Sequence, residues 1–386
     1  MLGLASACSY SSYIPFSTTK SLAFDGTNDY LDVGDNLDLG TGDFSISMWV
    51  YVTEATDNIL MSKWQDANNF WVLRTQVDDK VQFIAVVGGV TILSHISNAA
   101  LGSPLDSENR WVHVVYTNDR SNGSTGERIY IDGVLKGAGG ASSTTDIDNT
   151  GRLYIGRYDT TYTHAGTKMD EVAIWNYDLN SDHVAAIYDN GNPTELTSIK
   201  GLYSAQGSLQ AWWRMGDGAF DNISVVHDQV NPGFGSEEVT NGTFDSDTSG
   251  WTALSGAILT SDSGLLKVTN DGTGSNSGGA TQQITTVVGK TYQLSIYSNQ
   301  TLGSLRIGTS SGASNIFIRT FDYVGVYITA FIATTITTWV TMNSAIISAG
   351  AIRRYDNVSV KEVNGNPALV IGGVTSFNDD FSNSFN

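Results

Sequence analysis

The sequence lacks the features that would place it among disulfide-bonded, membrane-spanning or nucleic-acid-binding proteins. Cys8 is its single cysteine, so no disulfide can form within the chain. It has no apolar run of about 18 residues, and we therefore expect no membrane-spanning segment. Basic residues number 20 against 39 acidic ones, and the net charge of −19 argues against binding to a nucleic-acid backbone.

Catalytic signatures are missing as well. The sequence has no serine nucleophile elbow, phosphate-binding loop or dinucleotide fingerprint. Glycosidases need two carboxylates facing each other across a sugar, but Asp170 and Glu171 are consecutive, and a regular strand would send them to opposite faces. No two of the five histidines have metal-ligand spacing; they are His95, His113, His164, His183 and His227. We therefore expect a protein that is not an enzyme.

Proline is scarce, with 5 residues, whereas glycine is abundant, with 41. Together with the many Asp, Asn, Ser and Thr residues, this composition favours strands joined by polar turns. One short helix is predicted from Asp182 to Tyr188, with Ser181 as its N-cap and Gly191 beyond its end. The expected fold is all-β, with two jelly-roll β-sandwich domains and extended N- and C-terminal arms.

Alternating apolar residues predict the individual strands. In the first half they lie at 44–52, 111–116, 152–156 and 209–215, with a hairpin at 128–135 that turns through Asp132-Gly133. In the second half they lie at 264–269, 291–298, 304–308, 323–333, 337–342 and 354–360.

Two strands carry an aspartate where the alternation calls for an apolar residue. In Met169–Trp175, regular alternation places Asp170 on the face of Val172 and Ile174. In Tyr355–Val360, Asp356 takes the same place beside two valines. A carboxylate on an apolar face is costly unless hydrogen bonds or a cation compensate its charge, so each segment is read as the acidic last strand of a sandwich.

The pattern divides the chain into five parts. They are an N-terminal arm at 1–20, a first sandwich at 21–192, a return strand and linker at 193–236, a second sandwich at 237–363 and a C-terminal tail at 364–386. The start of the arm loosely resembles a lipoprotein cleavage site but lacks a basic beginning and a long enough apolar stretch. We read it as an ordered or docking arm. Phe377 and Phe381 in the tail need a surface to cover them.

Ordered motifs carry a family resemblance. In the first sandwich they are Phe24–Leu31, Gly42–Val50, Arg110–Val114, Ile131–Gly133 and Met169–Trp175. Together they resemble laminin-G-like domains of the concanavalin A type. In the second sandwich they are Val239–Asp245, Gly250-Trp251, Thr338–Thr341 and Tyr355–Val360, which resemble the galactose-binding-like jelly roll of family 4/9 carbohydrate-binding modules. The combination resembles structural proteins of tailed bacteriophages.

Both families commonly hold a structural calcium ion where the first and last strands meet. The resemblance therefore implies Ca²⁺ as a structural cofactor, with Asp25 and Asp170 as ligands in the first sandwich. Asp245 and Asp356 would be the ligands in the second. The alternative is that these carboxylates accept hydrogen bonds from backbone N–H groups at the strand ends.

Aromatic residues supply the candidate ligand-binding positions, because sugars stack on flat rings rimmed by polar groups. Most tryptophans are expected in the core, at positions 49, 111, 175, 251 and 339. Trp64 and Trp71 flank a polar turn, so one of them is expected to be exposed. The candidates are Trp64, Tyr158, Tyr162 and His164 in the first sandwich, and Tyr297 and Tyr323 in the second.

The leading functional hypothesis is a noncatalytic virion structural protein of a tailed phage, either a capsid decoration or a fibre-type surface protein. Its partners would be other virion proteins and host cell-surface glycans, and a homo-oligomer, specifically a trimer, is expected. The alternative is a secreted, extracellular bacterial carbohydrate-binding adhesin. In the phage hypothesis, residues 1–20 anchor the protein on the particle.

Overall fold

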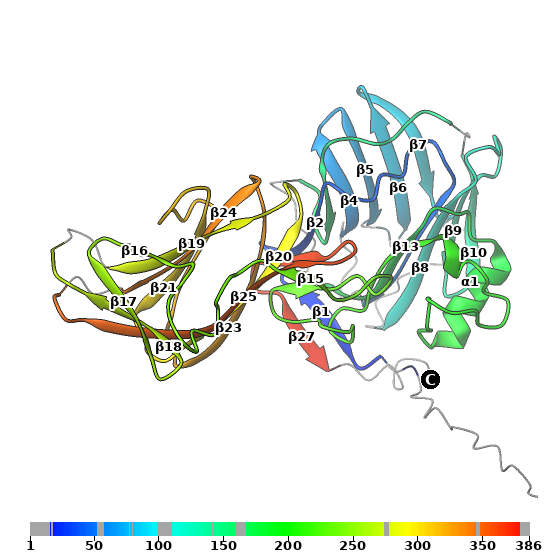
Figure 1. Cartoon of the computed structure of the whole chain (residues 1–386). Helices are drawn as coiled ribbons and strands as arrows, with labels where there is room; N and C mark the ends of the chain where they lie inside the picture. The colour runs from blue at the N-terminus through cyan, green and yellow to red at the C-terminus, as the bar shows by residue number, and fades with distance from the viewer. Residues whose placement is uncertain are drawn as a thin grey trace, which may run out of the picture.

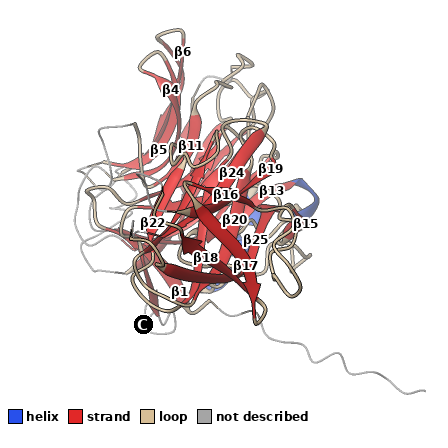
Figure 2. Cartoon of the chain, turned by 60° about the vertical axis from the view of Figure 1, so that its left-hand side comes forward, coloured by secondary structure: helices blue, strands red, loops and turns tan. Residues whose placement is uncertain are grey.

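The chain folds into two antiparallel β-sandwiches that lie side by side (Figure 1). The computed structural model describes residues 16, 18–51, 58–76, 78, 80–98, 110–140, 143–159, 167–273, 278–344 and 348–378. Nearly all regular structure is strand, and one α-helix stands out within these ranges (Figure 2). The all-β prediction is confirmed. Within the same ranges, no helix is long and apolar enough to cross a membrane.

The first sandwich consists of sheets A and B. Sheet A contains, in order, β10 (Val134–Gly139), β9 (Glu127–Ile131), β8 (Trp111–Asn118), β3 (Phe44–Tyr51), β12 (Thr167–Trp175), β1 (Lys20–Phe24) and β27 (Thr375–Asn378), with β13 (Leu209–Trp213) also paired to β12. Sheet B contains β14 (Val225–Val226), β26 (Ala368–Ile371), β2 (Tyr30–Gly34), β11 (Arg152–Ile155), β4 (Ile59–Asp66), β5 (Asn69–Thr75), β6 (Val81–Val87) and β7 (Val90–Ile96).

The second sandwich consists of sheets C and D. Sheet C contains β17 (Ala257–Asp262), β18 (Leu265–Asn270), β25 (Ile352–Val363), β20 (Thr291–Ser298) and β23 (Gly325–Ile332), with β15 (Phe234–Glu237) paired to β25. Sheet D contains β16 (Thr252–Leu254), β19 (Gly279–Thr285), β24 (Thr337–Ser344), β21 (Gly303–Gly308) and β22 (Phe317–Thr320). Every strand predicted from the alternation overlaps an observed strand.

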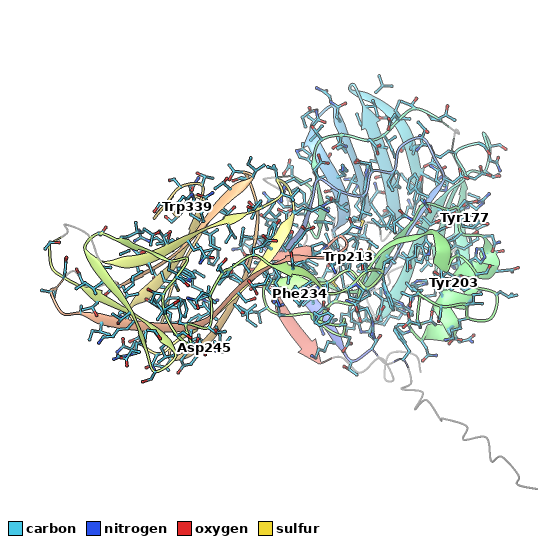
Figure 3. The ribbon with its side chains drawn as sticks, in the orientation of Figure 1. Tyr177, Tyr203, Trp213, Phe234, Asp245 and Trp339 are labelled. Atoms are coloured by element: carbon cyan, nitrogen blue, oxygen red, sulfur yellow. The ribbon has the colours of Figure 1, made fainter. Side chains whose placement is uncertain are left out.

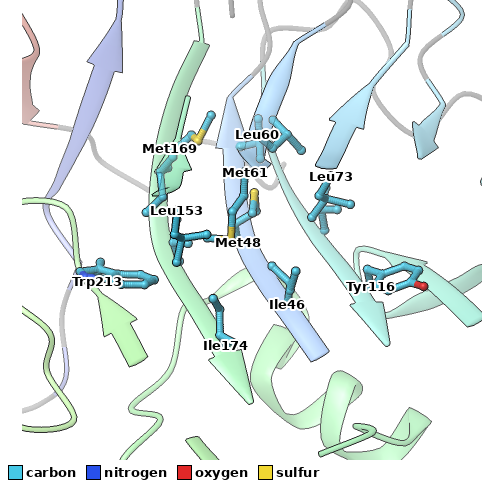
Figure 4. Packing of buried hydrophobic residues seen from close by; sticks show 14 of the residues in the cluster. Ile46, Met48, Leu60, Met61, Leu73, Tyr116, Leu153, Met169, Ile174 and Trp213 are labelled. Carbon is cyan, nitrogen blue, oxygen red and sulfur yellow. The ribbon is translucent and has the colours of Figure 1, made fainter. Parts of the chain in front are cut away.

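The core of the first sandwich lies between sheets A and B. Ile46 and Met48 of β3 meet Leu153 of β11 and Met61 of β4 there, all at most 1% exposed (Figure 4). The opposite side of sheet A is covered by the helix α1 (Ser181–Tyr188), the short turns η2 (Asp189–Gly191) and η3 (Gln206–Ser208), and the segment between them. Sheet A is therefore buried on both faces along β8 and β12, while the outer face of sheet B meets the second sandwich at β14 and β26.

The helix has a different N-cap from the predicted one. Asn180, not Ser181, occupies the cap, and its side chain accepts hydrogen bonds from the backbone N–H groups of Asp182 and His183, both at 3.0 Å. Ser181 is the first helical residue instead. Sequence reasoning missed the cap because both residue types favour that position.

The C-terminal segment returns to the first sandwich after the second sandwich is complete. β26 pairs with β2 and β14 in sheet B, and β27 pairs with β1 in sheet A. In Figure 1 the red β27 lies beside the blue β1. Residues expected as a tail thus contribute strands to both sheets, and Ala368 is fully buried in the core. The backbone of Phe377 pairs with Ser21, whereas Phe381 lies outside the described residues.

The two sandwiches meet through a small apolar cluster. Val225 of β14 and Leu369 of β26 contact Ala330 of β23 and Val363 of β25 in this cluster, with Phe234 at its side. Figure 3 shows Phe234 at the junction between the sandwiches. The contact is fixed further by two hydrogen bonds, from the Asn222 side chain to Gln293 Oε1 at 2.6 Å and from Ser224 Oγ to the Ile328 carbonyl at 3.3 Å. The sandwiches are therefore packed together rather than joined by a free linker.

The expected placement of Asp170 on an apolar face is wrong, because a β-bulge interrupts β12. Asp170 is opposite Trp49 of β3, but Ala173 is opposite Ser47, so β12 contains one extra residue. Glu171 has φ of 50°, in the left-handed region. The bulge shifts the alternation, and Met169 rather than Asp170 shares the core with Val172 and Ile174.

The same correction applies to Asp356 in β25. Tyr297 of β20 is opposite Asp356, while Ser295 is opposite Ser359, and Asn357 has φ of 50°. Tyr355 is therefore the residue that joins Val358 and Val360 in the core of the second sandwich. Regular period-two counting could not detect either bulge.

Candidate functional site

The outer face of sheet B carries a group of aromatic and charged side chains. They follow from alternation in β2, β11, β4 and β5: residues such as Leu31 and Leu153 point into the core, and their neighbours point outward. We call this group the aromatic face; it consists of Tyr30, Asp32, Trp64, Phe70, Arg152, Tyr154, Arg157 and Tyr158. All are partly exposed except Asp32, which is 8% exposed.

Three rings form one end of the aromatic face. The ring centroid of Trp64 lies 4.5 Å from that of Tyr158 and 5.1 Å from that of Phe70, and Phe70 and Tyr158 are 5.3 Å apart. Ser62 Oγ donates to the backbone carbonyls of Arg157 and Tyr158, at 2.6 and 3.1 Å, and so fixes this segment over β4. Burial raises the pKa of Tyr158 to about 12, so its hydroxyl remains a hydrogen-bond donor at neutral pH.

Arginine and tyrosine form the other end. The guanidinium of Arg157 lies 4.3 Å from the ring centroid of Tyr30 and 5.3 Å from that of Tyr154, within cation–π range. The two tyrosine rings are nearly perpendicular, with centroids 5.5 Å apart. The Nε of Arg157 donates to the Asp159 carbonyl.

Arg152 and Asp32 form an ion pair within the same face. Arg152 Nε donates to both Asp32 carboxylate oxygens at 2.9 Å, and Arg152 Nη2 lies 2.8 Å from Oδ2. Burial opposes the charge of Arg152, but the contact with Asp32 outweighs it and raises the arginine pKa. Asp32 is thus already neutralised by an arginine.

The structure brings together two of the four ligand candidates predicted for the first sandwich. Trp64 and Tyr158 are in direct ring contact, while Tyr162 and His164 lie outside the described residues. Trp71, across the same turn from Trp64, is fully buried. Sequence reasoning missed Tyr30, Phe70, Tyr154 and Arg157. Their alternation with core residues was a usable signal, because outward aromatic residues on neighbouring strands collect on one face.

The two candidates in the second sandwich do not form a comparable group. Tyr323 is 46% exposed, and its ring stacks on that of Tyr327 with centroids 4.3 Å apart. Its hydroxyl donates to the Val326 carbonyl at 2.9 Å. Tyr297 lies in β20 beside the bulge at Asp356. Both stay predictions.

The first pair of expected calcium ligands is not brought together. Leu22 of β1 is opposite Met169, which places Asp170 level with Ser21, four residues before Asp25. Four strand residues span roughly 13 Å. Asp25 Oδ1 accepts hydrogen bonds from the backbone N–H groups of Thr27 and Asn28, at 2.8 and 3.2 Å. The residues therefore do not fit a shared cation, and Asp25 stabilises a turn instead.

The second pair is close enough to interact. Burial raises the pKa of Asp356, and the negative charge of Asp245 raises it further, against the hydrogen bond from the Asn357 N–H at 2.7 Å. Asp245 Oδ2 accepts a hydrogen bond from Thr243 Oγ1. Figure 3 shows Asp245 on the side of the second sandwich away from Trp339. Within the described ranges no three acidic, histidine or cysteine residues are grouped as metal ligands, so a calcium site at Asp245 and Asp356 stays a prediction.

Asp170 and Glu171 are buried instead of lying in a cleft. They are 0% and 3% exposed. Glu171 accepts hydrogen bonds from Thr18 Oγ1 and Trp212 Nε1, both at 2.7 Å, and from Arg214 Nε at 3.3 Å. Burial raises the Glu171 pKa to about 7, although the charge of Arg214 lowers it. Neither carboxylate is accessible to a substrate.

Comparison with known proteins agrees with the architecture of the first sandwich. A family model described as the concanavalin A-like lectin/glucanases superfamily matches residues 25–185. This is the region in which the motifs resemble a laminin-G-like domain, and that region has the expected concanavalin A-like fold. No curated protein matches the sequence.

Three solved structures illustrate the likeness. A Bacteroides ovatus protein, described as a proposed carbohydrate-binding protein, is 19% identical with a TM-score of 0.40, and the match covers 55% of this chain and 56% of that one. The heptameric pentraxin of Limulus polyphemus is 13% identical with a TM-score of 0.35, covering 45% and 84%. A family 4 carbohydrate-binding module is 18% identical with a TM-score of 0.27, covering 32% and 98%.

Proposed function

We propose that the protein is a noncatalytic carbohydrate-binding protein and that the aromatic face of sheet B is its ligand-binding surface. The observation that carries this proposal is the arrangement of Trp64, Phe70 and Tyr158 beside Tyr154 and Arg157. Sugars bind through the stacking of their apolar faces on such rings and through hydrogen bonds to polar groups at the rim. The concanavalin A-like architecture of residues 25–185 is compatible with this role.

The lack of catalysis is part of the proposal. Cleavage of a glycosidic bond needs two carboxyl groups about 5–10 Å apart on either side of the bond. Asp32 is the one carboxylate on the aromatic face as defined here, and it is paired with Arg152. The buried pair Asp170 and Glu171 belongs to sheet A and is covered by Trp212.

A glycan array followed by calorimetry tests the proposal. The intact protein should bind at least one polysaccharide, and Trp64→Ala or Tyr158→Ala should weaken that binding at least tenfold. Tyr177→Ala is the matched control, because Tyr177 is 42% exposed but lies outside the aromatic face. Absence of binding to every glycan, or equal losses in all three variants, would overturn the proposal.

At a finer level, we propose that the protein is displayed on the surface of a tailed-phage virion, as a homotrimer held by its terminal segments. The pairing of Lys20 with Asn378 supports this, because it brings both ends of the described fold to the same edge of sheet A. Segments that continue from these positions can reach one common partner surface. A secreted bacterial adhesin fits the fold and the aromatic face equally well.

Truncation distinguishes the two roles. Phe16 stacks on Trp212, and Thr18 and Thr19 hydrogen-bond to Glu171 and Asp217, so removal of residues 1–15 preserves the observed contacts. The truncated protein should keep its thermal stability but no longer join the particle. Normal incorporation would contradict the anchoring role. Light scattering should give the mass of a trimer for the full chain.

A further inference from the structure

We propose that Arg157 makes the aromatic face selective for glycans that carry a negatively charged group, a carboxylate or a sulfate. This inference rests on the proposed carbohydrate-binding function and specifies the class of ligand. It starts from the unusual charge of this face, since arginines gather here on a chain with a net charge of −19. Arg152 and Arg157 belong to the face, and Arg74 of β5 interacts electrostatically with Tyr158.

The arginines differ in how far their charge is compensated. Arg152 is paired with Asp32, and Arg74 donates from Nε and Nη2 to Gln82 Oε1, at 3.0 and 2.8 Å. Arg157, in contrast, has no carboxylate partner within the ranges that the structure describes, and only its Nε is used, by the Asp159 carbonyl. No described residue accepts a hydrogen bond from its remaining N–H groups, which can therefore serve a ligand.

The two tyrosine rings hold the Arg157 guanidinium in place. Contact with Tyr30 at 4.3 Å and Tyr154 at 5.3 Å limits its movement, so less conformational entropy is lost when a ligand binds. A guanidinium positioned in this way presents a planar pair of donors that matches the two oxygens of a carboxylate or sulfate. The rings of Trp64 and Phe70 would contact the neighbouring sugar units.

The overall negative charge does not prevent this interaction. At physiological salt, charges separated by more than about 8 Å are largely screened, so the local environment dominates. The acidic groups that interact with this end of the face are Asp32, which is already paired, and Asp159, whose charge acts on Tyr158. The aromatic face as defined therefore has one arginine without a carboxylate partner among the described residues, and its single carboxylate, Asp32, is paired.

The test compares acidic polysaccharides with neutral counterparts in calcium-free buffer. The full chain is titrated with galacturonan, hyaluronan and alginate, each before and after chemical reduction of its carboxyl groups, and with dextran sulfate against dextran. At least one acidic polymer should bind tenfold or more tightly than its neutral counterpart, and added salt should weaken only the acidic member of the pair. The carboxylate and sulfate arms show which group is recognised.

Variants assign the effect to Arg157. Arg157→Gln should lower binding of the acidic polymer at least tenfold and remove its advantage over the neutral polymer, while Arg157→Lys should retain part of that advantage. Arg319→Gln is the matched control, because Arg319 lies 5.0 Å from the ring centroid of Tyr327 in the second sandwich. Its preference should be unchanged.

The outcomes separate this inference from the proposed function. Equal binding of acidic and neutral polymers, or an unchanged preference in Arg157→Gln, would overturn the charge selectivity and leave carbohydrate binding intact. Failure of every polymer and every array glycan to bind would overturn the proposed function itself. Circular dichroism of each variant confirms that a loss of preference does not come from unfolding.

Discussion

The two sandwiches contain the same local device in different surroundings. In β12 and in β25, an aspartate is followed by a residue with φ of 50°, and the backbone N–H of that residue donates to the aspartate Oδ1 at 2.7 Å. Each bulge lies where the strand changes its neighbour, from β1 to β13 in the first sandwich and from β18 to β15 in the second. The aspartate therefore stabilises a backbone conformation in both places.

The surroundings decide what else the carboxylate does. In the first sandwich the bulge is covered by Trp212, Arg214 and Thr18, and Asp170 is fully buried. Burial, reinforced by the charge of Glu171, raises the pKa of Asp170 well above its usual range. In the second sandwich Asp356 is partly exposed and interacts with Asp245. A shared sequence pattern thus predicts a shared turn of the backbone, not a shared ligand.

The largest expected effect concerns closure of the two sandwiches. The second is built from one continuous stretch, whereas the first needs β26 and β27 from the C-terminus. Removing residues 365–386 should destabilise the first sandwich by about 5 kcal/mol or more, enough to unfold a typical domain. Scanning calorimetry should show one transition lost and the other kept. Removing only 379–386 is the control, and two unchanged transitions in the longer truncation would contradict the prediction.

A smaller effect is expected at Gly242, which packs against the bulge of the second sandwich. A Cβ at this position would lie 1.9 Å from the Val358 carbonyl oxygen, so the backbone must shift. Gly242→Ala should lower the free energy of unfolding of the second sandwich by about 1–3 kcal/mol, measured by urea denaturation. Gly207→Ala has no atom within 4 Å of the new Cβ and should be close to neutral. Equal effects would argue against this packing.

The bulge of the first sandwich also predicts a pH dependence of stability. Because the folded-state pKa of Glu171 is about 7, above the usual value of 4.5, the folded state binds a proton more tightly than the unfolded state. The contribution of this group to stability is therefore present at pH 4.5 and lost as the pH rises toward 7, by about 1–3 kcal/mol. His113 and His227, with pKa values lowered by burial to about 3 and 4, act in the opposite direction.

Glu171→Gln removes the titrating carboxyl group and also the negative charge that helps to raise the pKa of Asp170. The difference in unfolding free energy between the wild type and the variant should change between pH 5 and 8, and urea denaturation at each pH measures it. A pH-independent difference for Glu171→Gln would show that its carboxyl group titrates normally.

Sequence reasoning found the strands because their apolar alternation is local. It placed β3, β20 and β24 to within a few residues, and it found the Asp132-Gly133 turn, where both residues have positive φ. It could not find the bulges, because an inserted residue is defined by the neighbouring strand. For the same reason it missed the return of β26 to sheet B, since four apolar residues near a terminus give no sign of their partner.

The candidate site likewise contains residues that a local sequence signal predicts and residues that only the pairing of distant strands brings together. Trp64 was predicted from the polar turn beside it, a local signal. Tyr30 and Tyr154 are far apart in the sequence, and only the pairing of β2 with β11 brings them to one face. Asp25 and Asp170 were predicted from the family resemblance to share a calcium ion, but the register of β1 against β12 separates them.

The smallest expected effect is a calcium response confined to the second sandwich. Asp245 and Asp356 interact there, whereas Asp25 and Asp170 are separated along β1. Ca²⁺ at ten times its dissociation constant should stabilise the second sandwich by about 1.4 kcal/mol, because a cation relieves the repulsion between two carboxylates. Asp356→Asn should abolish the shift of the calorimetric transition of the second sandwich. Asp25→Asn should leave that shift unchanged. A shift of the transition of the first sandwich alone would contradict this prediction, because it would place the cation at Asp25 and Asp170, which the register holds apart.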